Sequence, residues 1–447
     1  MTGSSPPARG IAENSAFYFA MQVVSFILGV AVSVVVTRAL GPSLRGEYFI
    51  IQTSSSLLVG LSSLGIAATN RYWLSKSKYL PAEVNTNSLL LSLFLGVLTM
   101  IIYFLFRDFL HATILKGVRS RFMLVGIFLI PFGLYSMAWS AIMAGMSRFP
   151  TLSIFTMATS LLNGILTLVI VLGLKARLQG LLSLWVVMTV LNLFIMLYLV
   201  ENGFRVRFIF RPRLIWEAIS FGSRDHLGSL AYHLMTNMDG YIVNSFLGLR
   251  ETGLYSLAKA LSGRVALLPN SLVQAAIPRI GGANEEEALT LTSKVVRHSL
   301  LLSVAACTLL VAFAPWGVPL LYGKEFLHSI VPLAWMAPGV VFLTLAVVLS
   351  SYTTFQRGKP EIPAVLTWIA LAVSVPLCIL LTKHGGINGS SLAVSITYCL
   401  LMILLSLPIL VRHRKFIKDS VSISRDDFSE YRRFLASKLT RPATRPV

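Results

Sequence analysis

Apolar runs of about 20 residues recur along almost the whole chain and are separated by short polar segments. A helix of about 20 mostly apolar residues crosses the roughly 30 Å hydrocarbon core of a bilayer. The runs lack the polar face of a helix that covers a soluble core, so they indicate spanning helices. The pattern predicts an all-α polytopic membrane protein with about 12 transmembrane helices, near residues 15–37, 47–69, 87–106, 122–145, 151–173, 180–200, 217–247, 254–277, 298–321, 331–355, 362–382 and 389–411.

Composition supports this class and excludes several others. Of the 447 residues, 55% are hydrophobic and 13% are charged, whereas soluble domains carry roughly 25% charged residues. The three cysteines fall inside predicted spans without disulfide or metal-ligand spacing, so neither a metal nor a cofactor is expected. No enzyme motif and no nucleotide-binding loop occurs, so we expect neither an enzyme nor an ATP-driven pump.

The distribution of Lys and Arg predicts the orientation, because cytoplasmic segments are enriched in both. With both termini in the cytoplasm, the inner segments hold 24 of the 38 Lys and Arg residues and the outer loops hold 11; 10 of the 24 lie in the tail. The formal net charge of +20 then reflects topology and attraction to anionic membrane lipids. Binding of nucleic acid is not expected.

Three sequence matches recur at nearly one spacing and indicate two similar halves. Leu-Gly, four residues, Gly, one residue and Tyr occurs at 40–48 and again at 247–255, an offset of 207. Segments 140–148 and 351–359 match at an offset of 211, and 179–180 and 388–389 at 209. Glycines suit any tight hairpin, so the shared offset is what argues for a repeat. An offset of six helices returns the chain to the same membrane side, so the halves are parallel.

The repeat predicts two pseudo-symmetric six-helix bundles, residues 1–206 and 207–411, followed by a basic cytoplasmic tail at 412–447. Two such bundles leave a cleft between them near the membrane midplane. That layout is typical of a transporter that works by alternating access.

Polar residues inside the predicted spans are candidate site residues, because charge is costly in a bilayer. The eighth span places five small or polar residues on one helical face: Ser256, Lys259, Gly263, Asn270 and Gln274. Arg264 stands at the edge of this stripe, about 15 Å deep by the helical rise. We predict that Arg264, Lys259, Asn270 and Gln274 line the cleft and contact the substrate. Snorkelling to an interface is the alternative, mainly for Lys259.

The seventh span adds Arg224, Asp225 and Asp239. Arg224 is a further candidate for the cleft, although a local interfacial pair with Asp225 explains it equally simply. Asp239 lies at a depth similar to that of Lys259, so the two can form an ion pair. Asp239 and Asp225 share one face, and either ion coupling or helix pairing accounts for them.

The first half offers fewer charged candidates. At an offset of 207, Gln52 takes the place of Lys259 and Leu57 that of Arg264, so the cleft is expected to be charged mainly on its second-half wall. Asn163 and Asn192 are the notable polar residues of the first half. Hydrogen bonds between helices explain them better than contacts to a ligand.

The chain also resembles a known family, on motifs whose order and spacing are specific. The motifs are Thr37-Arg38-Ala39-Leu40-Gly41-Pro42, Ser63-Leu64-Gly65-Ile66, Ala144-Gly145-Met146-Ser147-Arg148-Phe149, Met238-Asp239-Gly240-Tyr241, Gly253-Leu254-Tyr255-Ser256-Leu257-Ala258-Lys259, Leu321-Tyr322-Gly323-Lys324-Glu325-Phe326 and Gln356-Arg357-Gly358-Lys359-Pro360. They resemble the Wzx-type polysaccharide flippases, the O-antigen and repeat-unit transporters of the polysaccharide transport family. That family belongs to the MOP (multidrug/oligosaccharidyl-lipid/polysaccharide) superfamily, with the MATE drug exporters. The chain departs from the family pattern at Gly240, where a basic residue is common.

The resemblance implies that the two bundles form a MATE-like V shape. It also implies a transporter of the cell inner membrane that exports a polyprenyl-pyrophosphate-linked oligosaccharide from the inner to the outer leaflet. A diphosphate needs cationic partners, and Arg is suited to bidentate contact with phosphate. Arg264 and Lys259 would supply such charges. The resemblance also implies that the glycan polymerase and glycosyltransferases of the same pathway are partners.

Three other functions fit parts of the sequence. An ion-coupled MATE-like exporter of small organic cations would need an acidic cleft, whereas the predicted cleft is basic. A membrane enzyme such as a glycan polymerase would need a large outer loop, and no predicted outer loop exceeds about 16 residues. A scaffold without transport activity also fits, and only a transport assay excludes it.

Overall fold

The computed structural model describes residues 11–204, 209, 211–413, 416, 420 and 422. Within its helices, only the backbone is described at 11–26, 200–204, 212–213, 221, 223–225, 268, 274–275 and 278. The predicted cytoplasmic tail at 412–447 therefore lies almost wholly outside the described residues.

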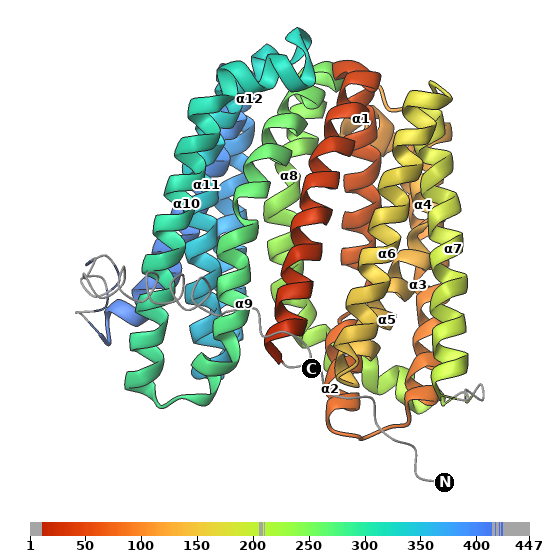
Figure 1. Cartoon of the computed structure of the whole chain (residues 1–447), viewed down its shortest axis with the longest axis vertical. Coiled ribbons are helices and arrows are strands. Elements are labelled where there is room, and N and C mark those ends of the chain that lie inside the picture. Colours follow the sequence, from red (N-terminus) through yellow and green to blue (C-terminus); the bar gives the residue numbers. More distant parts are fainter. Residues whose placement is uncertain are drawn as a thin grey trace, which may run out of the picture.

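The described chain is helical throughout and contains no β-strand (Figure 1). The long helices are α1 (Ile11–Ser62), α2 (Ile66–Ser75), α3 (Pro81–Thr113), α4 (Ser120–Phe128), α5 (Ile130–Gly145), α6 (Phe149–Leu168), α7 (Leu178–Phe204), α8 (Pro212–Val265), α9 (Leu267–Gly282), α10 (Glu285–Tyr322), α11 (Ile330–Ser351) and α12 (Glu361–Leu410). Short turns of π or 3₁₀ geometry extend two of them: η1 (Val169–Gly173) follows α6, and η2 (Lys324–Ser329) and η3 (Tyr352–Gln356) adjoin the two ends of α11.

Three of the helices fold back on themselves at a single glycine. The kinks lie at Gly41 in α1 (φ 66°, ψ 177°), at Gly248 in α8 (φ 83°, ψ 179°) and at Gly386 in α12 (φ 57°, ψ −142°). These dihedral angles are accessible to glycine and costly for residues with a Cβ atom. Each kink divides its helix into a first and a second arm. The sequence pattern predicts loops where α1 and α8 turn, but one glycine makes each turn within an otherwise helical chain.

Counting the arms gives the predicted number of spans. In the described part of the chain, eight helical stretches are long and apolar enough to cross a membrane. Two of them, in α1 and α12, consist of two arms. The two arms of α8, the second continued by α9, add the remaining pair, so the prediction of about 12 transmembrane helices is confirmed.

The backbone repeats at the spacing that the sequence matches predict. Gly41 and Gly248 are 207 residues apart and have nearly the same φ and ψ. Two more pairs of residues with positive φ recur at an offset of 211: Ser147 with Gly358, and Lys175 with Gly386. The two halves are therefore pseudo-symmetric copies of one six-helix unit.

The helices form two groups that stand side by side (Figure 1). We call α1–α7 the N-terminal group and α8–α12 the C-terminal group. Each has its own apolar core, and the first arm of α8 contributes to both, with Ala218 and Tyr241 in one core and Met235 in the other. The kinks of α1, α8 and α12 lie at one end of the molecule, which we call the kink end. The opposite end, where α1 begins and α12 ends, is the terminal end.

Candidate functional site

The two groups meet at the kink end through a symmetric pair of glycines. A Cβ atom at Gly46 would lie 1.9 Å from the carbonyl oxygen of Leu249, and one at Gly253 would lie 1.8 Å from that of Pro42. Gly46 and Gly253 are 207 residues apart, as are Pro42 and Leu249. The second glycine of each Leu-Gly…Gly-x-Tyr motif therefore lies where the backbones of α1 and α8 cross in close contact. A hairpin turn alone would not require a glycine at these two positions.

Hydrogen bonds reinforce this closure. Asn244 of α8 donates from Nδ2 to the carbonyl oxygens of Ile114 (3.0 Å) and Lys116 (3.2 Å) in the N-terminal group. Arg38 of α1 donates from Nε to the carbonyl oxygen of Leu321 (2.6 Å) in the C-terminal group. The kink end is thus closed by contacts from both sides.

At the terminal end, the first arm of α8 is fastened to the N-terminal group. Tyr79 donates to Glu217 (2.6 Å), and Arg211 forms an ion pair with Glu83 (2.8 Å). Gly65 makes a close backbone approach, because a Cβ there would lie 2.1 Å from the carbonyl oxygen of Gly222. The first arm of α8 therefore contacts the N-terminal group at this end, while it also packs into the core of the C-terminal group.

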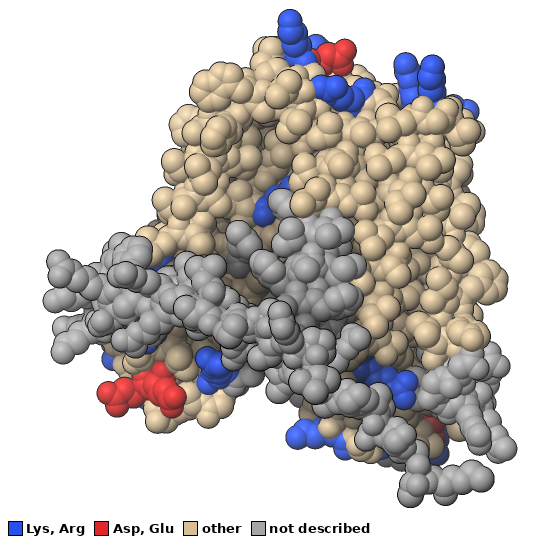
Figure 2. Space-filling view, in the orientation of Figure 1, with Lys and Arg blue, Asp and Glu red and all other residues tan. Residues whose placement is uncertain are grey.

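The surface between the two groups is hollowed on the face seen in Figure 2. A Lys or Arg side chain stands inside the hollow, whereas the other charged side chains visible on this face gather at the two ends. The sequence predicts several charged residues along this cleft.

Arg264 joins the two groups at mid-depth. Its Nη2 donates to the carbonyl oxygen of Gly29 in the first arm of α1 (3.0 Å). Gly29 lies 12 residues before the kink at Gly41, or about 18 Å from the kink end at a rise of ~1.5 Å per residue. Arg264 thus lies where the first arm of α1 and the second arm of α8 face each other, and its side chain is partly exposed.

Arg45 is a second guanidinium of this site, although the predicted spans assign it to an outer loop. It lies on the second arm of α1, is mostly shielded from solvent and donates to Thr37. Its Nε is buried without a hydrogen-bond partner among the described residues. Arg45 lies near enough to Arg264 for their charges to repel. The sequence predicts charge mainly on the second-half wall, and Arg45 adds one charge from the first half.

Lys259 and Asp239 form an ion pair that ties together the two arms of α8. The Lys259 Nζ donates to Oδ1 (2.6 Å) and Oδ2 (2.8 Å) of Asp239 and to the carbonyl oxygen of Thr236 (2.7 Å). Tyr255 also donates to the Asp239 carboxylate, which is 4% exposed. The three Nζ donors are thereby used, and Lys259 brings little net charge to the cleft. Its charge lies 5.9 Å from the Phe49 ring of the N-terminal group.

The remaining predicted site residues are only partly placed. Asn270 lies on α9 with an exposed side chain. The side chains of Arg224, Asp225 and Gln274 lie outside the described residues. The stripe predicted along the eighth span is interrupted at Ala266, where α8 ends. Pro269 explains the break, because it has no N–H for the Val265 carbonyl and its ring crowds that oxygen.

Within the described part of the chain, the two asparagines of the first half do not make the predicted hydrogen bonds between helices. Asn163 has an exposed side chain. Asn192 lies on α7, and its Oδ1 is buried with no hydrogen-bond partner among the described residues. Asn192 lines a cavity described below.

The Asp239–Lys259 pair gives a testable expectation for stability. Asp239→Asn should lower the free energy of unfolding by about 3 kcal/mol, at the low end for breaking a buried pair because Lys259 is 23% exposed. Lys259→Met should cost a similar amount. The double variant should recover most of the loss, as measured by thermal melting of the purified protein. Losses that simply add in the double variant would contradict a direct pairing.

Comparison with protein families gives one match that covers most of the chain. A family model described as "Polysaccharide biosynthesis protein" matches residues 11–284, more than half of the chain. No curated protein matches the chain.

Solved structures with the same fold cover nearly the whole chain. An inward-facing multidrug resistance MATE family transporter of the MOP superfamily superposes with a TM-score of 0.72 at 17% identity, over 88% of this chain and 96% of that one. The eukaryotic MATE transporter AtDTX14 gives 0.66 at 16% identity, over 90% and 96%. An outward-facing MATE family transporter gives 0.62 at 18% identity, over 90% and 94%. At these identities the likeness concerns the fold, and it is greater for the inward-facing arrangement.

Proposed function

Because this chain belongs to the polysaccharide biosynthesis protein family and shares the fold of MATE transporters, we propose that it is a membrane transporter of the MOP superfamily, which moves a polyprenyl-pyrophosphate-linked oligosaccharide from the inner to the outer leaflet by alternating access. The proposal combines the family, the closed kink end and the charges between the two groups. Catalysis by bond formation or cleavage is not part of it.

The observation that carries the proposal is the placement of Arg45 and Arg264. The two guanidinium groups come from opposite helix groups and repel each other inside the membrane-spanning part of the molecule. Like charges that lie close together in a medium of low dielectric constant are costly, and an anionic ligand bound between them lowers that cost. A diphosphate carries the charge and the oxygen geometry that two guanidinium groups bind by charge-assisted hydrogen bonds.

The arrangement of the ends supports the direction of transport. The kink end is closed, and the fold superposes better on an inward-facing transporter than on an outward-facing one. In our proposal the terminal end faces the cytoplasm, in line with the Lys and Arg bias. The headgroup enters between the two groups from that side while the polyprenyl tail stays in the bilayer. Opening of the kink end then releases the headgroup to the other leaflet.

Export of small organic cations is the main alternative, and the charges argue against it. An organic cation needs an available carboxylate, and the Asp239 carboxylate already accepts hydrogen bonds from Lys259 and Tyr255. Two guanidinium groups would in addition repel a cationic substrate.

Reconstitution of the purified chain into liposomes separates the two functions. Undecaprenyl diphosphate that carries a fluorescent oligosaccharide is placed in one leaflet, and a membrane-impermeant quencher reports its arrival in the other. We expect movement at least about 10-fold faster than in protein-free vesicles, and no uptake of ethidium or tetraphenylphosphonium under a pH or Na⁺ gradient. Cation uptake without lipid movement would overturn the proposal in favour of an exporter.

A further inference from the structure

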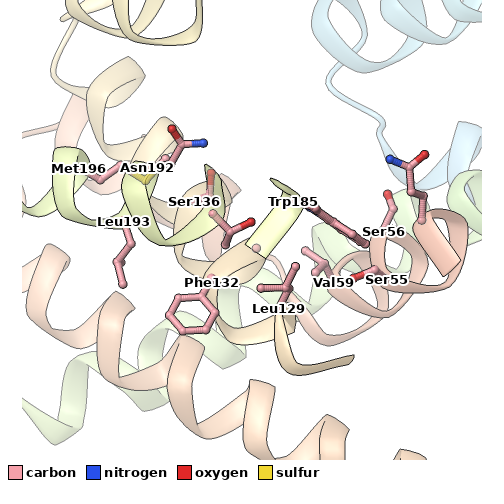
Figure 3. A pocket seen from close by; sticks show the side chains of 13 residues that line it. Ser55, Ser56, Val59, Leu129, Phe132, Ser136, Trp185, Asn192, Leu193 and Met196 are labelled. Carbon is pink, nitrogen blue, oxygen red and sulfur yellow. The ribbon is translucent and has the colours of Figure 1, made fainter. Parts of the chain in front are cut away.

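A second cavity lies inside the N-terminal group, apart from the guanidinium groups. Its volume is about 440 Å³, within the roughly 300–1,000 Å³ of sites that bind small organic ligands. The second arm of α1, the α4–α5 segment and α7 line it (Figure 3). Its lining residues are Gln52, Ser55, Ser56, Val59, Leu129, Phe132, Gly133, Ser136, Trp185, Thr189, Asn192, Leu193 and Met196.

The described lining residues combine neutral hydrogen-bonding groups with aromatic rings, and none of them is ionisable. Figure 3 shows Ser136 and Asn192 towards one end of the cavity and Trp185 with Ser55 and Ser56 towards the other. A sugar ring presents hydroxyl groups at its edge and C–H groups on its face. Amide and hydroxyl side chains can form hydrogen bonds with the hydroxyl groups at the edge of the sugar, and an aromatic ring can pack against its C–H face.

One of these polar groups is buried and lacks a partner in the described structure. The Asn192 Oδ1 accepts no hydrogen bond from a described residue. Leaving such an atom unsatisfied costs about 1–3 kcal/mol. A ligand hydroxyl that donates to the amide, after a small rotation of the side chain, would remove this cost. Gln52 and Ser56 add exposed side chains on the cavity wall.

The cavity adjoins the cationic site along one face of α1. Gln52 follows Arg45 by seven residues, which places both on the same side of the helix about 10 Å apart along its axis. Between them, Tyr48 accepts a hydrogen bond from the Gln52 Nε2 (2.8 Å). A diphosphate held at Arg45 therefore has its attached sugars within reach of the cavity.

We propose that this cavity binds the first sugars of the transported lipid, and that it selects neutral hexoses or N-acetylhexosamines over acidic or amino sugars. Among the described lining residues there is no Lys or Arg to offset the carboxylate of a uronic acid, and no Asp or Glu to offset an ammonium group. The inference rests on the proposed function, because the diphosphate brings the sugar to the cavity.

Binding of two probes tests the inference with the purified full-length protein in nanodiscs. The probes are undecaprenyl diphosphate and undecaprenyl diphosphate that carries one N-acetylglucosamine. We expect the glycosylated probe to bind about 10-fold more tightly. Trp185→Ala and Asn192→Leu should each remove most of this gain and leave the affinity for the bare diphosphate unchanged, which also shows that the variants are folded. The matched control is Phe194→Ala on the same helix, whose side chain is 64% exposed, and it should keep the gain.

The outcomes separate the two proposals. Equal affinity of the wild type for both probes would overturn the sugar site while leaving the flippase proposal intact. Cavity variants that weaken the binding of both probes equally would overturn the sugar site in the same way. Binding of neither probe would contradict the proposed function, and the sugar site with it. A uronic acid in place of N-acetylglucosamine should abolish the gain, and a gain of equal size would contradict the selectivity.

Discussion

Replacement of Arg264 by alanine is expected to reduce translocation of the lipid-linked glycan by about 100-fold while leaving the protein folded. Arg264 stands between the first arm of α1 and the second arm of α8, at mid-depth, where a diphosphate headgroup must pass. A hydrogen bond to a charged group contributes about 1.5–3 kcal/mol, and a bidentate guanidinium makes two. About 3 kcal/mol of lost interaction corresponds to the expected factor. The liposome assay for lipid movement measures it.

Two further variants sharpen this test. Arg264→Lys keeps the charge but loses the planar fork, so it should retain an intermediate rate. Arg279→Ala is the matched control, because Arg279 is exposed in the last turn of α9, and it should transport normally. Elution and melting profiles establish that each variant is folded. A normal rate for Arg264→Ala would remove Arg264 from the substrate site.

The sequence predicts the membrane architecture well. Each apolar run identifies a spanning helix by itself, and several matches at nearly one offset together identify the repeat. The number of spans, the two pseudo-symmetric bundles and the family resemblance are confirmed. The turns are less well predicted. A single glycine in α1 suffices to reverse the chain, so residues after Gly41 are helical and Arg45 faces the protein interior instead of solvent.

The candidate site was predictable only in part, for physical reasons that concern individual residues. The position of Lys259 along the eighth predicted span places it in the cleft. Only the structure shows that its Nζ donates to Asp239 and to the Thr236 carbonyl oxygen. Arg45 could have been found from its spacing of seven residues to Gln52, which puts both on one helical face. The Asn192 Oδ1 lacks a described hydrogen-bond partner because of how α1, α5 and α7 pack around the cavity. No short sequence pattern predicts this packing.

Enlarging the glycines at the kink end should shift the protein towards an arrangement with that end open. Cβ atoms closer than 3.0 Å to another atom are essentially never found, whereas those at Gly46 and Gly253 would lie 1.9 Å and 1.8 Å from backbone oxygens. Backbone cannot rotate away as a side chain can, so Gly46→Ala and Gly253→Ala must force α1 and α8 apart. Overpacking of this kind costs about 1–3 kcal/mol, enough to change the ratio of closed to open molecules by about 5- to 150-fold.

Spin labels on cysteines at Asp108 and Arg250, both exposed on opposite groups, would report this change as a longer distance across the kink end. Transport should fall as well, because a cycle that cannot close this end cannot load from the other side. Gly317→Ala in α10 is the control, since a Cβ there meets nothing within 4 Å, and it should leave distance and rate unchanged. Gly46→Ala and Gly253→Ala disrupt the same crossing from its two sides. The double variant should therefore lengthen the distance little more than either single variant does. Fully additive shifts would show that the two glycines act separately, and an unchanged distance in either single variant would show that the crossing of α1 and α8 does not hold the kink end closed.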